Sequence, residues 1–175
     1  MKKHLVFLVG AVLAITVWSC GKTWEIPIAK KLVVAQIEKQ FPLEKGGLLT
    51  IKLTNPKVQF DGARSKVIID LDVTVSAPLG LAAGNGAISV ESNLGYNADK
   101  KSVVLKDPAL RDITIANFNN DKVNEVKEII VPLIGKVLDG VSVYTFDQNS
   151  TIEKLASKHL AGFRITDDDL IIQIK

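Results

Sequence analysis

Period-two alternation of hydrophobic and polar residues dominates the middle of the chain. In residues 66–76 the apolar side chains fall on alternate positions, and the residues between them are polar except for Ile68. Shorter segments with the same period surround Ile51, Ile88, Val103 and Ile113. Strands with one apolar and one polar face form antiparallel sheets that are covered on one side only. The pattern therefore predicts such a sheet.

Helical periodicity of three and four residues occurs in three other segments. Pro27 is suited to the first turn of a helix over residues 28–40, and Gly140 is suited to end a helix over residues 121–139. From Ile129 onward the second helix is apolar on most sides, which predicts burial on most sides, and Pro132 predicts a kink or a break in it. A third, short helix is predicted over residues 150–159, where Ser150 and Glu153 have the spacing of a capping box.

The order of these segments indicates the fold class. A strand over residues 141–146 precedes the third helix, and two strands, 162–166 and 170–175, follow it around the acidic turn 167–169. Strands and helices do not alternate one for one, and no repeat or linker divides the chain after the leader. We therefore expect one α+β domain over residues 27–175, with an antiparallel sheet and a long helix in its C-terminal half.

The first nineteen residues have the layout of a secretory signal peptide. Lys2 and Lys3 precede an uncharged run over residues 5–18, and Cys20 follows at its exit. As a helix this run would span about 21 Å, which is short of the ~30 Å hydrocarbon core of a bilayer. Export with cleavage, rather than a permanent membrane span, is therefore expected.

Residues 17–20, Val-Trp-Ser-Cys, resemble a bacterial lipobox. Under this interpretation Cys20 carries diacylglycerol and palmitate-like acyl chains, and residues 20–26 are a short tether to the membrane. Gly21 is not the aspartate of inner-membrane retention signals, which favours the periplasmic leaflet of the outer membrane in a Gram-negative envelope. The alternative is an ordinary signal peptide with an incidental cysteine.

Composition and charge narrow the possible functions. The chain is 47% hydrophobic and 23% charged, as expected for a folded domain. Without Lys2 and Lys3 there are 20 basic and 19 acidic residues, so the formal charge falls from +3 to +1 and a nucleic-acid partner loses its support. Cys20 is the only cysteine, so no disulfide within the chain is possible.

Residues that carry chemistry are few, and none forms a catalytic or metal-binding motif. His159 is the only histidine after the leader, which excludes a zinc site with two imidazoles within one chain. The acidic run 167–169 lacks calcium-loop spacing, and Gly84-Asn85-Gly86 lacks a following phosphate-binding motif and indicates a turn. Asp70 and Asp72 share the polar face of their strand. We therefore predict no enzyme, no metal and no cofactor.

The order of elements, together with Phe41-Pro42 after the first helix and Val143-Tyr144-Thr145-Phe146 after the long one, resembles the YceB-like bacterial lipoproteins, a family of unknown function. The resemblance implies the fold of one TULIP module, in which a strongly curved antiparallel sheet wraps a long helix. It also implies an apolar groove that accepts acyl chains. Small branched side chains lining helix and sheet are compatible with such a groove. A solid, fully packed core is the competing interpretation.

Two functions follow as expectations. The first is a membrane-tethered, non-enzymatic periplasmic protein that binds a lipid or another apolar ligand between helix and sheet. Its candidate groove residues are Val126, Ile130, Leu133, Ile134 and Val137 on the helix and Ile69, Leu71 and Val73 on the sheet. The alternative is an envelope assembly or interaction protein with a solid core and no ligand.

Three apolar residues outside the predicted core are candidates for contact with a membrane or a partner. Leu79 and Leu81 lie in the uncharged segment 77–86, which is predicted to be a loop, and Trp24 follows the tether. The alternatives are that the leucines plug one end of the fold and that Trp24 packs under the first helix.

Overall fold

The computed structural model describes residues 23–46, 50–76, 83–116 and 120–175. Its strands are β1 (Trp24–Ala29), β2 (Leu43–Lys45), β3 (Thr50–Asp61), β4 (Lys66–Ser76), β5 (Ala83–Asn97), β6 (Ser102–Ile115), β7 (Ser142–Thr145), β8 (Leu160–Ile165) and β9 (Asp169–Ile174). Its helices are α1 (Lys30–Glu38), α2 (Asn120–Leu138) and α3 (Thr151–Lys158). The α+β class with antiparallel strands is confirmed.

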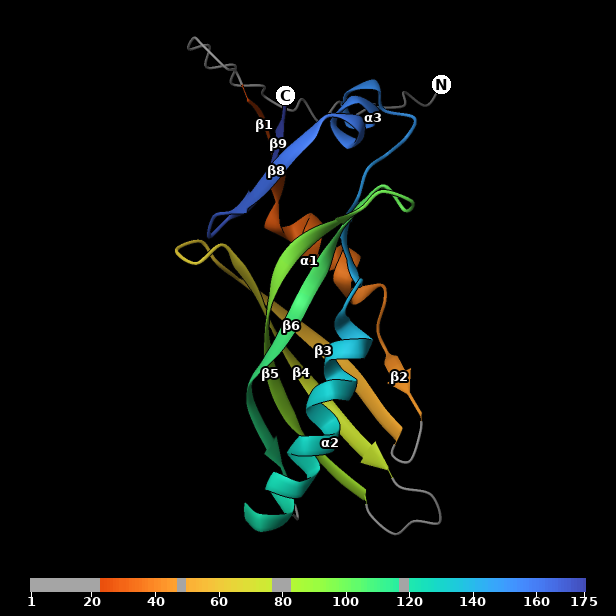
Figure 1. The fold of residues 1–175 in the computed structure, drawn as a ribbon, viewed down its shortest axis with the longest axis vertical. Coiled ribbons are helices and arrows are strands. Elements are labelled where there is room, and N and C mark those ends of the chain that lie inside the picture. Colours follow the sequence, from red (N-terminus) through yellow and green to blue (C-terminus); the bar gives the residue numbers. More distant parts are fainter. Residues whose placement is uncertain (1–22, 47–49, 77–82, 117–119) are drawn as a thin grey trace, which may run out of the picture.

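Six strands form a strongly curled antiparallel sheet in the order β2-β3-β4-β5-β6-β7. Figure 1 shows this sheet along the length of the molecule, with the smaller sheet and α3 at one end. Strand β4 has the bounds predicted from its alternation, and its apolar residues Val67, Ile69, Leu71, Val73 and Val75 are all buried. The concave face of the sheet is therefore the apolar one.

Bulges bend the long strands. The pairing of β3 with β4 shifts register between Thr54 and Lys57, and β5 shifts against β6 around Glu91. Asn55 and Asp107 adopt positive φ angles beside these shifts, and each is followed by a proline, which a sheet tolerates at a bulge. Because a bulge increases twist and bends its strand, these irregularities explain how the sheet curls.

A second sheet has three strands in the order β1-β9-β8. The prediction that Pro27 begins a helix is wrong, because Pro27 lies in β1 opposite Ile171 and the helix begins only at Lys30. Strand β1 is an edge strand, where the missing N–H of proline is tolerated. The two closing strands predicted from the sequence are present as β8 and β9, and the predicted capping of α3 by Ser150 is present as well.

The predicted long helix wrapped by the sheet is not borne out. The three helices are short beside the strands, and α2 packs against β6 and β2, which lie on opposite sides of the curled sheet. In Figure 1 α2 lies along the open side of this half-barrel. The helix continues through Pro132, which excludes a break there, while the alternative of a kink stays a prediction. Both Val131 and Pro132 are exposed, so the predicted burial on most sides is wrong.

The predicted loop over residues 77–86 is shorter than expected, because residues 83–86 belong to β5. Gly84-Asn85-Gly86 is therefore strand, not a turn. At Gly86 a Cβ atom would lie 1.9 Å from the carbonyl oxygen of Thr114 on β6. Glycine here permits the close approach of two backbones, which the sequence pattern alone does not distinguish from a turn.

Hydrogen bonds join the two sheets. The carboxylate of Asp167 accepts from the backbone N–H of Gly62 (3.1 Å), and the hydroxyl of Ser65 accepts from the N–H of Ile165 (2.9 Å). The hairpin between β3 and β4 thus holds the hairpin between β8 and β9. In the described part of the chain, both sheets contribute residues to a single apolar core.

Candidate functional site: the apolar interior of the curled sheet

The predicted groove residues on the sheet lie side by side in its concave face. Ile69 pairs with Val58 on β3 and with Val90 on β5, while Leu71 pairs with Ile88. All three predicted positions on β4 are at most 2% exposed. Cross-strand neighbours of this kind form a continuous apolar surface.

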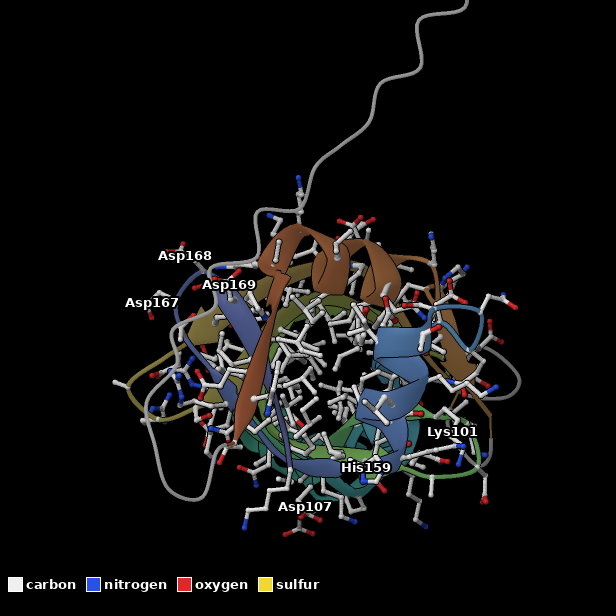
Figure 2. All side chains as sticks on the ribbon, turned by 90° about the horizontal axis from the view of Figure 1, so that it is seen from above. Lys101, Asp107, His159, Asp167, Asp168 and Asp169 are labelled. Atoms are coloured by element: carbon white, nitrogen blue, oxygen red, sulfur yellow. The ribbon has the colours of Figure 1, made fainter. Side chains whose placement is uncertain are left out.

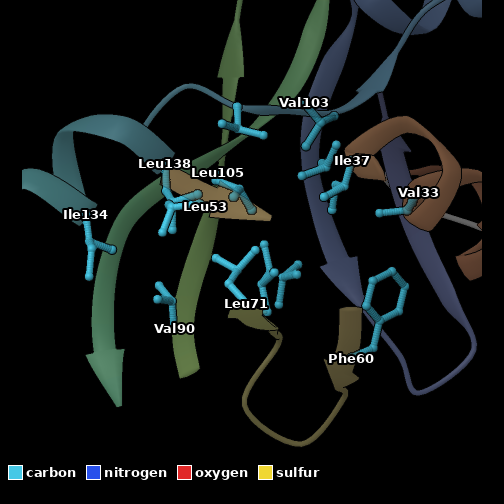
Figure 3. Close-up of a cluster of buried hydrophobic side chains, with 14 of the residues drawn as sticks. Val33, Ile37, Leu53, Phe60, Leu71, Val90, Val103, Leu105, Ile134 and Leu138 are labelled. Carbon is cyan, nitrogen blue, oxygen red and sulfur yellow. The ribbon is translucent and has the colours of Figure 1, made fainter. Parts of the chain in front are cut away.

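Helix α2 adds a stripe of side chains to the same cluster. Ile130, Ile134 and Leu138 recur every four residues and are at most 1% exposed, whereas Leu133 and Val137 are only partly buried at its margin. Figure 3 shows Ile134 and Leu138 projecting from α2 into the cluster that contains Leu53, Val90 and Leu105. The structure therefore brings together the predicted residues of helix and sheet. Val126 lies in α2 but outside the residues whose side chains are described.

Helix α1 closes the interior toward the second sheet. Val33 and Ile37 are buried in the cluster, and Figure 3 places Val33 near Phe60. The side-chain amide of Gln40 donates to the carbonyl oxygen of Ser142, and its carbonyl oxygen accepts from the N–H of Ser142 at 3.0 Å. This two-way contact connects the end of α1 to β7, an edge strand of the large sheet.

The other predicted contact residues are divided. Trp24 is 60% exposed at the start of β1, so it does not pack beneath α1. Cys20, Leu79 and Leu81 lie outside the described residues. Within the described ranges, no helix is both long enough and apolar enough to cross a membrane.

The polar residues for which the sequence predicts no catalytic or metal-binding role lie on the outside of the fold. Asp70 accepts from the side-chain amide of Gln59 (3.0 Å) and Asp72 from that of Asn55 (2.6 Å), both on the convex face of the sheet. In the end view of Figure 2, His159, Asp167 and Asp168 lie at the periphery of the molecule. Across the described residues, no three His, Cys, Asp or Glu side chains are grouped as metal ligands would be.

An ion-pair cluster on the convex face was not predicted. The Glu91 carboxylate on β5 lies 2.9 Å from Arg64 Nη1, 3.2 Å from Lys66 Nζ and 3.8 Å from Arg111 Nε. Hydrogen bonds from Lys66 first, and then from Arg64, hold the pKa of Glu91 below its usual range. Arg64 also binds Asp61 (2.7 Å) and lowers the pKa of that carboxyl. Glu91 and its three basic partners are spread over residues 64–111, so strand pairing, and not local spacing, brings their charges together.

A surface cleft of about 380 Å³ lies between the end of α1 and β3. Glu38, Phe41, Lys52 and Asn55 are among the residues that line it. None of the predicted groove residues lines this cleft, which is open and of mixed polarity. It is therefore separate from the apolar interior.

An aromatic cluster lies where β7 approaches α3. Phe146 makes edge-to-face contacts with Tyr96 and Tyr144, at ring-centroid distances of 6.1 and 5.5 Å. The hydroxyl of Tyr96 donates to the carbonyl oxygen of Ser157 in α3 (2.8 Å). Burial, and then the neighbouring Glu153 carboxylate, raise the pKa of Tyr144 above its usual range. These contacts fix α3 on the rest of the fold and leave both phenols protonated at neutral pH.

Residues 30–168 match the family described as "Protein of unknown function (DUF1439)". The chain belongs to this family. The matched range begins with the first residue of α1 and ends in the turn before β9, so it includes the whole curled sheet of this DUF1439 protein. No curated protein matches the chain.

Proposed function

We propose that this DUF1439 protein is a membrane-tethered envelope lipoprotein of the YceB-like kind, which binds an acyl chain between α2 and the curled sheet. The observation that carries the proposal is the composition of the interior. Five of the predicted groove residues, Ile69, Leu71, Val73, Ile130 and Ile134, are buried in one apolar cluster formed by helix and sheet. An apolar interior without charged groups recognises hydrocarbon and no polar reactant, which is consistent with a binder and not an enzyme.

Binding requires α2 to move away from the sheet. The five residues are at most 2% exposed, so protein atoms already cover them and an acyl chain must displace some of these contacts. Helix α2 packs against β2 on one side, and β2 has only three residues. We propose that the seam between α2 and β2 opens for the ligand, because short strands separate at the lowest free-energy cost.

Uptake of a fluorescent fatty acid by the purified mature protein tests this function. Ile130→Trp adds bulk between α2 and the sheet, where the acyl chain would have to enter, and is expected to weaken uptake about tenfold, equivalent to ~1.4 kcal/mol. Val131→Trp is the matched control, because the neighbouring side chain is 41% exposed on the same helix and its replacement leaves the interior unchanged. Native mass spectrometry of the wild-type protein is expected to detect co-purified lipid. Absence of both bound lipid and saturable uptake would refute the proposal.

The second candidate function is an envelope assembly or interaction protein with a solid core. The same low exposure of Ile69, Leu71 and Ile134 favours it, since a packed core has this property without any ligand. Under this hypothesis, neither tryptophan variant changes lipid content. Crosslinking in the envelope would then identify a protein partner.

The tether has its own test. Cys20→Ala is expected to release the protein from membranes and to abolish labelling with radioactive palmitate. Cys20→Ser serves as a second variant of nearly the same size as cysteine. Unchanged labelling in either variant would exclude acylation at Cys20, whatever the interior binds.

A further inference from the structure

Three of the five exposed large apolar side chains in the described residues lie at one end of the molecule. Trp24 is 60% exposed, Ile152 56% and Leu155 52%, whereas Leu32 (51%) lies on α1 and Val131 (41%) on α2. Figures 1 and 2 show that α3 and the beginning of β1 lie at the same end, which we call the α3 end. The curled sheet with α2 extends away from it.

The strand register explains why these residues share one end. Trp24 pairs with Ile174 on β9, and Ile174 pairs with Leu160 on β8. Since β8 follows α3 after His159 alone, Trp24 lies two strands from the point where α3 ends. On β1, Trp24 also has the same parity as Ile26 and Ile28, which pack in or against the core. The apolar face of β1 therefore continues beyond the core to the exposed end.

Helix α3 is amphipathic in an unusual way. Ala156 and Ser157 are buried toward the fold, whereas its outer surface combines Ile152 and Leu155 with the exposed Lys154 and Lys158. Mixed apolar and basic side chains on one exposed surface are typical of segments that lie in a membrane interface.

The nearby acidic side chains already have hydrogen-bond or ion-pair partners within the fold. Glu153 accepts from the N–H of Asp147 (2.7 Å), and Asp147 accepts from the N–H of Asn149 (2.8 Å). Glu25 on β1 binds Arg164 and Gln173. The lysines of α3 have no carboxylate partner among the ion pairs of the described residues. Their charge is therefore available to an anionic surface.

Chain length links this end to the proposed anchor. Trp24 follows Cys20 by four residues, and four extended residues span at most about 14 Å. We infer that the α3 end, through Trp24, Ile152, Leu155, Lys154 and Lys158, lies on the surface of a bilayer that contains anionic phospholipid. This inference rests on the proposed acylation of Cys20, which holds the α3 end close to that surface. The seam between α2 and β2 then points away from the headgroups.

Brominated phospholipids, which quench tryptophan in contact with their acyl chains, test the inference. Trp18 belongs to the proposed leader, so the mature protein with Trp24→Phe has no tryptophan and accepts a single probe. The full chain is expressed with its leader, and the mature form is reconstituted into vesicles of phosphatidylethanolamine and brominated phosphatidylglycerol. Leu155→Trp is expected to lose about half of its emission relative to unbrominated vesicles, as for a side chain at the acyl boundary.

Val131→Trp is the matched control, because it is an exposed apolar position on α2, away from the α3 end. Its emission is expected not to change. Equal quenching of both probes, or of neither, overturns the inference. Protection of Leu155→Trp from aqueous acrylamide without bromolipid quenching overturns it as well, since the surface is then covered by protein. Lys154→Glu with Lys158→Glu is expected to weaken the association of the α3 end with these anionic vesicles about fivefold or more per lysine, and so to reduce the quenching of Leu155→Trp.

Acylation at Cys20 and docking of the α3 end can be refuted by different measurements. The mass of the purified mature protein reports whether acyl chains are attached at Cys20. If they are absent, the same two probes are mixed with preformed vesicles at high lipid concentration. Selective quenching of Leu155→Trp then supports the docking surface without the anchor, and its absence refutes both.

Discussion

The two sheets bury their residues differently. In the curled sheet, residues 70–76 of β4 have one apolar and one polar face, and the polar side chains Asp72, Thr74 and Ser76 are exposed. In the small sheet, the central strand β9 buries the consecutive residues Leu170, Ile171 and Ile172. This half of β4 therefore provides a one-sided lining for an interior, whereas β9 is covered on both faces over residues 170–172. The ligand binding that we propose uses the first region, and the docking that we propose uses the second.

The largest expected effect comes from a cavity in the lining. Ile134→Ala removes a side chain that is 1% exposed between α2 and the concave face. The loss of packing is expected to lower the free energy of unfolding by about 2–5 kcal/mol. Urea denaturation measures this value. Ile152→Ala on α3 is the control and should change stability by less than about 0.5 kcal/mol, because its side chain is mostly in solvent. Similar losses in both variants would contradict the distinction between the two regions.

Two glycines sharpen the comparison within the curled sheet and its helix. Gly86→Ala places a Cβ atom against the Thr114 carbonyl and is expected to cost about 1–3 kcal/mol, because the backbones of β5 and β6 must separate. At Gly135 in α2, a Cβ would have no neighbour within 4 Å. Gly135→Ala is therefore expected to stabilise the fold by ~0.5–1 kcal/mol through helix propensity. Thermal denaturation of the two variants should give shifts of opposite sign.

Alternation predicted the one-sided antiparallel sheet, although not its curl, because the burial of each strand follows one local rule. Each strand is half-buried, so Ile69, Leu71 and Val73 and the polar residues between them reveal both faces directly. The capping of α3 was predictable for a similar reason, since Ser150 and Glu153 interact within one turn. The candidate lining followed from these local patterns, and the structure gathers its described members in one cluster.

Long-range pairing explains what the sequence did not predict. Pro27 is compatible with a helix start, and only pairing with Ile171, 144 residues later, makes its segment a strand. The ion-pair partners of Glu91 come from β6 and from the β3–β4 hairpin, so no local spacing indicates the cluster. The position of α2 across β2 and β6 depends likewise on how far the sheet curls. Periodicity reports which face of an element is buried but not which element covers it.

The hydrogen bonds between Gln40, at the end of α1, and Ser142 on β7 are expected to make an intermediate contribution to stability. Gln40→Ala removes both hydrogen bonds to Ser142 and leaves these partly buried backbone groups of β7 without a partner from α1. A loss of about 1–2 kcal/mol is expected, and amide hydrogen exchange should increase first in β7. Gln59→Ala is the control, because Gln59 makes an exposed side-chain bond to Asp70. An equal loss in the control would show that α1 does not hold β7.

The smallest expected effect concerns the convex face of the curled sheet, where Glu91 meets three cations. Hydrogen bonds from Lys66 and Arg64 lower its pKa in the folded state, so its contribution to stability is present above the ordinary pKa of a glutamate. That contribution disappears as the pH falls through the lowered pKa. Glu91→Gln is therefore expected to reduce stability slightly at neutral pH and to flatten the decline below the ordinary glutamate range. Urea midpoints measured across acidic pH would reveal this change. An unaltered profile for Glu91→Gln would mean that solvent screens the cluster and that the curl of the sheet depends on its apolar face alone.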